Sequence, residues 1–360
     1  MRLQAQRLMG EPFASAVEAV RWFGAVQSQD YAAAKWGVGQ RVAGATEAIL
    51  DAAFDAGALL RTHVMRPTWH FVLPEDIRWL QELTSARVLA GLAGRHRQLE
   101  LDQHTIARAA DLFATALADQ HALTRADLGE VLLSAGISPH GQRLPHLLAA
   151  AEHACVITSG PRRGNQHTYS LVRDRAPAAR SLAREEALAE LSTRYFRSHG
   201  PAQLRDFAWW SGLKIGDIRL GIELAGRSLE HGTAGGADYW WAAEALDGGR
   251  QARVAHLLPN FDEFTVGYRD RSALIDRNVR FDPRLFAYFR GSAPQAGILS
   301  NVVTIDGRVR GAWTRKLSGA RTVVNLMLLA DLDPAELAAV SSAAGKLARF
   351  LHREVEVRGL

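Results

Sequence analysis

Two stretches of this chain repeat one short pattern, and the repeat limits what the chain can fold into. HALTRADLGEVLLSAG (121–136) and HGPAQLRDFAWWSGL (199–213) each contain a histidine, a few small residues, a short helix with apolar anchors and a closing glycine. This pattern is typical of a compact helix–turn–helix. Its recurrence predicts one supersecondary unit used several times along the chain.

The first third of the chain adds a hairpin to such helices. Apolar spacing predicts helices over 15–27 and 46–57, the second with Thr46 as N-cap and Gly57 as C-cap. LLRTHV and TWHFV then read as two β-strands, and Pro67 between them predicts the turn. Helices followed by a hairpin make a winged-helix unit.

The same order of elements recurs before the composition changes. Helices are predicted over 105–119 and 121–138, followed by a wing in PRRGNQHTYSLV and a third pass that begins at EEALAEL. From about residue 236, short β-type runs such as GADYWWAAEA and ILSNVVTI take over, and Asp306-Gly307 is a strong two-residue hairpin signal. A helix over 333–355 and a last strand in EVRGL close the chain. These runs predict a small antiparallel barrel or curled sheet.

Together the patterns predict an α+β fold in which three tandem winged helix–turn–helix motifs scaffold a C-terminal antiparallel β-barrel. The 360 residues are enough for several domains. We expect winged-helix units at 1–85, 86–180 and 181–235, and the barrel with its closing helix at 236–360.

Composition excludes several classes of protein. No apolar run reaches the 18 or so residues of a membrane span, and MRLQAQRLMG lacks the apolar core of a signal peptide, so we expect a cytoplasmic protein without membrane contact. The single cysteine, Cys155, rules out an internal disulfide and a site built from several thiolates. Dinucleotide, phosphate-loop, zinc-protease and serine-hydrolase motifs are absent. We therefore expect neither a cofactor nor a metal.

The charge of the chain is compatible with nucleic-acid binding. The formal net charge is +5, and only four of the 43 basic residues are lysines. Arginine suits bidentate contacts to phosphates and bases. Basic hairpins could therefore lie along a nucleic-acid backbone, although a solvated basic face fits the same pattern. The predicted DNA-binding residues are Arg61, Arg66, Arg162, Arg163, Arg269, Arg271, Arg308, Arg310, Arg315 and Lys316.

The stretch VQSQD raises a separate question, because two glutamines flank Ser28 where an apolar helical pattern ends. Side chains at i and i+2 diverge on a helix but share a side on an extended chain. Gln27 and Gln29 could then converge, and each amide offers two donors and an acceptor that can hold a water. The same spacing also fits amides that cap the helix end or pair with the backbone.

The segment RTHVMRPTWHFV alternates polar and apolar residues. Arg61, His63, Arg66, Thr68 and His70 alternate with apolar or aromatic neighbours, and on a hairpin this predicts one polar face. Such a face suits a DNA-contacting wing, and it also suits an ordinary half-buried hairpin. His70 alone reads as a hydrogen-bonded structural histidine.

Five segments together resemble the AlkZ-like DNA glycosylases, a superfamily of tandem winged-helix proteins. They are VQSQD, RTHVMRPTWHFVLPEDIRWL, HGPAQLRDFAWWSGL, LLPNFDEFTVGYRDRS and VVTIDGRVRGAWTRK, in this order along nearly the whole chain. The resemblance implies three winged-helix motifs and a β-barrel in a C-shaped, DNA-binding arrangement, and a monomer that acts on double-stranded DNA with alkylated bases.

The resemblance also implies a site. The family's Gln–apolar–Gln signature maps onto Gln27 and Gln29 as catalytic residues, with Ser28 at the position that is apolar in the family. Supporting residues would be Asp30, His63, Thr68 and His70.

The implied activity is removal of N7- or N3-alkylated purines, including bulky adducts or interstrand crosslinks, by a monofunctional glycosylase. An alkylated purine is cationic and leaves readily, so two amides that orient water and stabilise the sugar cation suffice. Two alternatives fit the sequence without this chemistry: a winged-helix DNA-binding protein or regulator, and a self-resistance protein that sequesters a DNA-reactive metabolite.

Overall fold

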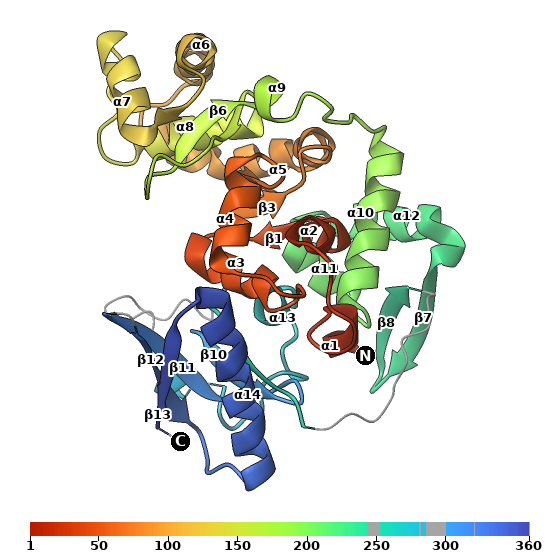
Figure 1. Cartoon of the computed structure of the whole chain (residues 1–360). Coiled ribbons are helices and arrows are strands. Elements are labelled where there is room, and N and C mark those ends of the chain that lie inside the picture. The colour runs from red at the N-terminus through yellow and green to blue at the C-terminus, as the bar shows by residue number, and fades with distance from the viewer. Residues whose placement is uncertain (243–252, 281, 286–299, 320, 360) are drawn as a thin grey trace. The chain divides into compact units, whose positions relative to one another are not determined.

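The structure is a computed structural model that describes residues 1–242, 253–280, 282–285, 300–319 and 321–359 (Figure 1). The chain divides into two compact bodies. Body 1 comprises Met1–Leu50, Thr193–Trp210 and Gly226–Leu360, and body 2 comprises Asp51–Ser192 and Ser211–Ala225. The four predicted domain boundaries stay a prediction. Residues 243–245 and 298–299 of the predicted strand runs lie outside the described residues.

Body 2 contains most of the helices. In chain order its elements are α4 (Glu47–Asp55, which begins in body 1), β2 (Leu60–Val64), β3 (Arg66–Val72), α5 (Ile77–Gln98), α6 (Gln103–Gln120), β4 (Leu123–Thr124), α7 (Arg125–Ser134), α8 (Arg143–His153), β5 (Ile157–Ser159), β6 (Thr168–Leu171), α9 (Val172–Arg175) and α12 (Ile215–Ala225).

The segment from α6 to β6 has the arrangement predicted for a winged helix. The sheet order is β4-β6-β5, with both pairs antiparallel, and Arg163 pairs with Gln166 at the tip of the wing. Thr124 opens α7 as predicted, in a capping box in which it and Asp127 each bond the other's backbone N–H. A core that includes Phe113, Leu128 and Leu147 fills the centre of this segment. A similar order of elements recurs along 16–72 and 184–242, and the count of three winged helices stays a prediction.

The hairpin of β2 and β3 forms as predicted, but the predicted faces are wrong. Met65, with φ of 62°, makes the turn, and Pro67 lies inside β3. A register shift beside the turn places His63 opposite Trp69 and Thr62 opposite His70. Opposed residues share a face, so His70 is fully buried with Thr62, while His63 shares its face with an aromatic ring. Polar and aromatic residues are therefore mixed on each face.

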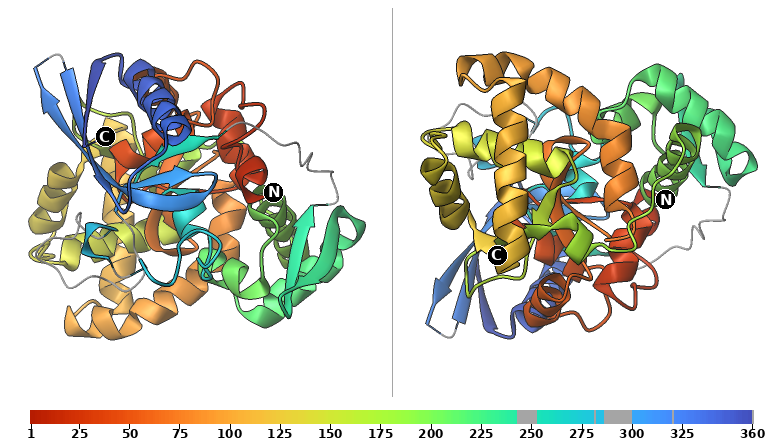
Figure 2. Two further views of the ribbon diagram at one scale, coloured as in Figure 1. Left: turned by 90° about the horizontal axis from the view of Figure 1, so that it is seen from below. Right: turned by 90° about the horizontal axis from the view of Figure 1, so that it is seen from above.

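Body 1 combines short N-terminal helices with a curled sheet (Figure 1, Figure 2). In chain order its elements are α1 (Arg2–Ala5), α2 (Ala16–Phe23), β1 (Val26–Gln27), α3 (Tyr31–Gly39), α10 (Arg184–His199, which begins in body 2), α11 (Leu204–Ser211, whose last residue is in body 2), the 3₁₀ turn η1 (Gly226–Ser228), β7 (Leu229–Ala234), β8 (Ala237–Ala242), β9 (Ala255–Leu258), α13 (Glu263–Val266), β10 (Val302–Ile305), β11 (Arg308–Ser318), β12 (Arg321–Leu328), α14 (Pro334–Leu351) and β13 (Glu354–Arg358).

The C-terminal strands form a half-barrel with the order β13-β12-β11-β10-β9. The predicted Asp306-Gly307 turn joins β10 to β11, and both residues have the positive φ that a type I′ turn requires. The prediction of an all-antiparallel sheet is wrong for one pair: β13 runs parallel to β12, because α14 crosses back between them. Within the described residues β9 and β13 are the edge strands, and closure into a barrel stays a prediction.

Helix α14 packs against this sheet. The helix begins at a capping box between Asp333 and Glu336 and contacts β9, β10 and β13. On the sheet's other side, a cluster that includes Leu258, Phe264 and Val302 ties α13 to the strands. The loop between β9 and α13 is thereby held in place, and it is this loop that reaches the glutamine segment.

No helix among the described residues is long and apolar enough to cross a membrane.

Candidate active site

The Q-x-Q segment (Gln27, Ser28 and Gln29) lies in a short link between two helices. Gly24, with φ of 80°, ends α2 at Phe23, so the C-terminal end of the predicted helix over 15–27 lies four residues too far along the chain. Asp30 begins α3 as its N-cap and accepts a hydrogen bond from the Ala33 N–H at 3.0 Å. The link is therefore fixed at both ends, and Val26–Gln27 within it is extended.

The two glutamines differ in their surroundings. Gln27 is buried and Gln29 is exposed. Ser28 between them is fully buried. The segment thus passes from the interior of body 1 to its surface within three residues. Convergence of the two amides stays a prediction.

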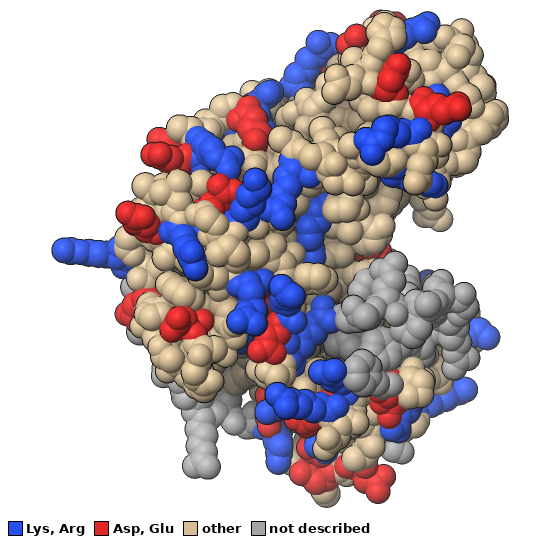
Figure 3. All heavy atoms as spheres, turned by 180° about the vertical axis from the view of Figure 1, so that it is seen from behind, with Lys and Arg blue, Asp and Glu red and all other residues tan. Residues whose placement is uncertain are grey.

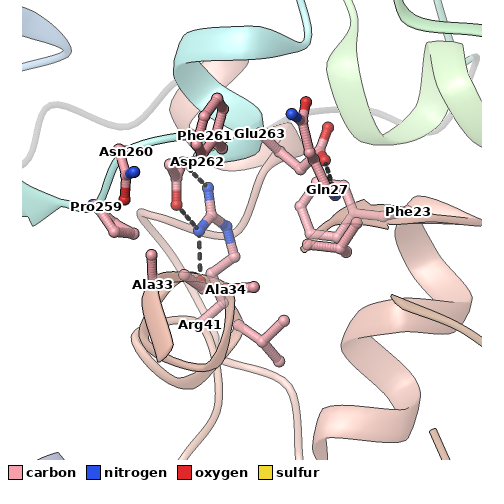
Figure 4. Close-up of a pocket in the computed structure, with 13 residues that line it drawn as sticks. Phe23, Gln27, Ala33, Ala34, Arg41, Pro259, Asn260, Phe261, Asp262 and Glu263 are labelled. Carbon is pink, nitrogen blue, oxygen red and sulfur yellow. Dashed lines mark hydrogen bonds and ion pairs between the residues drawn. The ribbon is translucent and has the colours of Figure 1, made fainter. Parts of the chain in front are cut away.

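Gln27 lines a small pocket between α3 and the loop before α13 (Figure 4). Phe23, Arg41 and Glu263 are among the other lining residues. The pocket has a free volume of about 10 Å³, which is room for a single water. An amide in the wall of a water-sized pocket can hold that water by its carbonyl or its NH₂ group.

Glu263 is the group that holds the backbone of Gln27. Its Oε1 accepts a hydrogen bond from the Gln27 N–H at 2.6 Å, and its Oε2 accepts one from Trp210 Nε1 at 2.8 Å. His199 Nε2 lies 3.3 Å from the same Oε2. The Glu263 side chain is almost completely buried, and a buried carboxylate needs such donors to replace water.

His199 is held in turn by an aromatic stack. Its ring lies parallel to Tyr195, with centroids 4.5 Å apart. Burial lowers the pKa of His199, and the nearby Glu263 carboxylate opposes that shift. A neutral imidazole donates its Nε2 proton to Glu263 and needs no extra charge in the core.

Asp262, the residue before Glu263, binds the Arg41 side chain. Asp262 accepts two hydrogen bonds of 2.8 Å from the Arg41 guanidinium, which also donates to the Gly37 carbonyl at 2.6 Å. Arg41 and Asp262 are both buried. Trp36 Nε1 donates to the Leu257 carbonyl at 2.6 Å and fixes α3 against β9. The consecutive carboxylates Asp262 and Glu263, at the start of α13, therefore hold both Gln27 and Arg41, which follows α3.

The predicted supporting residues take up other contacts. Asp30 serves as the cap of α3. On the hairpin of body 2, His63 Nδ1 pairs with Glu152, and its ring lies 4.3 Å from that of Trp69. His70 Nδ1 donates to the Thr68 carbonyl at 3.0 Å. A role for these residues in the site stays a prediction.

Several of the predicted DNA-binding residues pair with carboxylates. Arg162 bonds Asp51 and Asp55, and its side chain holds the pKa of Asp55 below its usual range. Arg308 lies 2.9 Å from Asp276, and Arg310 lies 3.2 Å from Glu336.

The other predicted DNA-binding residues differ in exposure. Arg61 lies over the Trp69 ring. Arg163, which lies 3.5 Å from Asp127, is exposed, as are Arg269 and Lys316. Arg66, Arg271 and Arg315 are half-buried. Lys and Arg side chains gather on the face seen in Figure 3, with acidic side chains scattered among them.

Sequence reasoning missed the residues that surround Gln27. Glu263, His199 and Trp210 are far from it along the chain, and no spacing rule connects them. The available signal was the pair Asp262-Glu263 within the apolar run LLPNFDEFTV, because charged residues inside such a run are buried only when they have partners. No cluster in the described parts of the chain joins three or more His, Cys, Asp or Glu side chains as a metal site would.

Comparisons with known proteins place the chain in a family. The family described as "DNA glycosylase AlkZ-like" matches residues 20–350. The solved structure of the DNA glycosylase AlkZ from Streptomyces sahachiroi has a TM-score of 0.77 to this chain at 22% sequence identity. That match covers 99% of this chain and 97% of that chain, and at this identity it shows the fold alone. No curated protein sequence gives a significant match. The chain belongs to the AlkZ-like family of DNA glycosylases.

Proposed function

We propose that this DNA glycosylase hydrolyses the N-glycosidic bond of N7- or N3-alkylated purines in double-stranded DNA, with water positioned by Gln27 and Gln29. The observation that supports the proposal is the place of Gln27, which is one of the residues that line a pocket with room for one water. Gln29, two residues on, is exposed, and in this proposal it faces the DNA.

Cleavage of this bond does not require a strong general acid in the site. Alkylation makes the purine cationic, so the base leaves without strong protonation and the positive charge moves to the sugar. Amide carbonyl dipoles that are fixed before the reaction stabilise that charge, and they orient the water toward C1′. Neutral amides perform both tasks and do not form a salt bridge with the cationic substrate.

The reaction is proposed to leave the strand intact. A strand-cleaving glycosylase forms an imine between a neutral amine and C1′. Lys35, the lysine nearest in sequence to the Q-x-Q segment, is buried with its Nζ 3.0 Å from a Glu47 carboxylate oxygen. An ammonium in such an ion pair carries no lone pair for attack, which supports direct hydrolysis.

Wild-type protein incubated with duplex DNA that contains N7-methylguanine is expected to release the free base and leave an abasic site in an uncut strand. Mass spectrometry of the supernatant measures the base, and a denaturing gel before and after alkali measures the strand. An undamaged duplex is the control. Absence of release from every alkylated purine tested would contradict the proposed activity. Strand cleavage without alkali would contradict the proposal that the enzyme is monofunctional.

The small pocket also bears on substrate size. Its free volume of about 10 Å³ is far below the roughly 300–1,000 Å³ of a ligand pocket. We propose that the damaged base is not enclosed in this pocket but stays outside it, so that bulky N7 adducts and interstrand crosslinks are accepted.

Release rates for N7-methylguanine and for a bulky N7 adduct are therefore expected to agree within about tenfold, since only a pocket that encloses the base would exclude the larger group. Single-turnover kinetics on two duplexes of the same sequence measure this. A bulky adduct that binds with equal affinity but is cut more than a thousandfold more slowly would show that the base is enclosed.

A further inference from the structure

We propose that Glu263 is a positioning residue for catalysis: its buried carboxylate fixes the backbone of Gln27 and so aims the Gln27 amide. This inference rests on the proposed function of Gln27. The contact that carries it is the 2.6 Å hydrogen bond from the Gln27 N–H to Glu263 Oε1 (Figure 4). A charged acceptor makes such a bond roughly twice as strong as a neutral one.

The position requires a carboxylate rather than any polar group. Both oxygens act as acceptors, Oε1 for Gln27 N–H and Oε2 for Trp210 Nε1 at 2.8 Å. A glutamine in this place has one acceptor oxygen, and its NH₂ group would face an N–H donor. One of the two buried donors would then lose its partner and stay unsatisfied in the core.

Glu263 is itself held on several sides, so it can transmit order to Gln27. Trp210 and His199 are fully buried, and His199 is stacked on Tyr195. The preceding residue, Asp262, is fixed by the two hydrogen bonds from Arg41. The Glu263 side chain therefore has little freedom to move, and the peptide of Gln27 bonds to a rigid acceptor.

Loss of this contact would act on the chemical step and leave DNA binding nearly unchanged. Glu263 is buried beneath the Q-x-Q segment and is not exposed to DNA. A small displacement of a positioned group can reduce the rate by about 100-fold, and loss of a supporting hydrogen bond typically reduces it by about 10–100-fold. If Glu263 served only folding, its substitution would change neither the release rate of the folded protein nor the protection of the Gln27 amide in particular.

The test compares Glu263→Gln with the wild type by two independent readouts. The first is hydrogen exchange at the Gln27 amide, followed by NMR, which does not depend on activity. The second is the single-turnover rate of N7-methylguanine release, with the DNA dissociation constant measured in parallel. We expect exchange at Gln27 to be at least about tenfold faster, the rate to fall by about 10–100-fold, and DNA affinity to stay within about twofold.

Glu230→Gln is the matched control. Glu230 lies on β7 of body 1 and accepts an indole N–H, from Trp241 Nε1 at 2.8 Å, as Glu263 does from Trp210. The same substitution there should leave both readouts at wild-type values. Equal protection of the Gln27 amide in Glu263→Gln and in the wild type would overturn the inference, as would an unchanged release rate.

The two proposals can fail separately. If the wild type releases no base, the proposed function fails, and amide exchange still decides whether Glu263 holds Gln27. If Glu263→Gln does not fold, Glu263→Asp takes its place, because it keeps two acceptor oxygens on a side chain one methylene shorter. The same losses are expected of it, since the shorter side chain cannot reach Gln27 and Trp210 together.

Discussion

Gln27→Ala is expected to lower the single-turnover rate of base release by about 100- to 1,000-fold, the loss typical when a preorganised dipole is removed from a transition state. Gln27 is one of the residues that line the water-sized pocket, and the substitution removes its amide dipole. Quench-flow or manual sampling with excess enzyme on N7-methylguanine DNA measures the rate. DNA affinity should change little, because Gln27 is buried.

Gln29→Ala is expected to reduce the rate as well, and it should also weaken binding of damaged DNA slightly, because Gln29 is exposed. Gln103→Ala, at an exposed glutamine that begins α6 in body 2, is the matched control and should react at the wild-type rate. If both site variants keep the wild-type rate, the catalytic centre lies elsewhere in the chain.

Arg41→Ala is expected to destabilise the protein by about 3–5 kcal/mol, because it removes the ion-pair partner of the buried Asp262 carboxylate. Both partners are buried, and the guanidinium makes two hydrogen bonds to the carboxylate. Urea unfolding monitored by tryptophan fluorescence measures the loss. The same variant should lose base release, because this ion pair anchors the start of α13, where Glu263 lies.

Arg321→Ala provides the comparison for that loss. Arg321 pairs with Glu354 at 2.8 Å, but both side chains are more than half exposed, so solvent and salt screen the interaction. Its removal should cause a much smaller change in stability. If the two variants unfold at the same urea concentration, the buried pair is not the anchor that its geometry indicates.

Local patterns in the sequence predicted the elements of the fold well. The Thr124 cap, the Asp306-Gly307 turn and the closing helix all depend on residues within a few positions of each other, and such signals act over one turn of chain. The face assignment of the first hairpin failed because it depends on register. A single-residue turn at Met65 exchanged the partners across the strands, and a shift of one residue reverses every face.

The candidate site was predicted only in part for a similar reason. The resemblance of VQSQD to the family signature points to Gln27 and Gln29, whose catalytic role stays a prediction. The predicted helix through Gln27 missed the break at Gly24, since glycine is tolerated within helices and its positive φ is a property of the fold. Glu263 lies 236 residues from Gln27 along the chain, and tertiary packing alone brings them together.

The most direct measurement of the central claim is release of 7-methylguanine by the wild type and by the double variant Gln27→Ala/Gln29→Ala, followed side by side with all DNA bound. The account predicts complete release by the wild type and release close to the uncatalysed background by the double variant. Equal release by the two proteins, or none by the wild type, would contradict it.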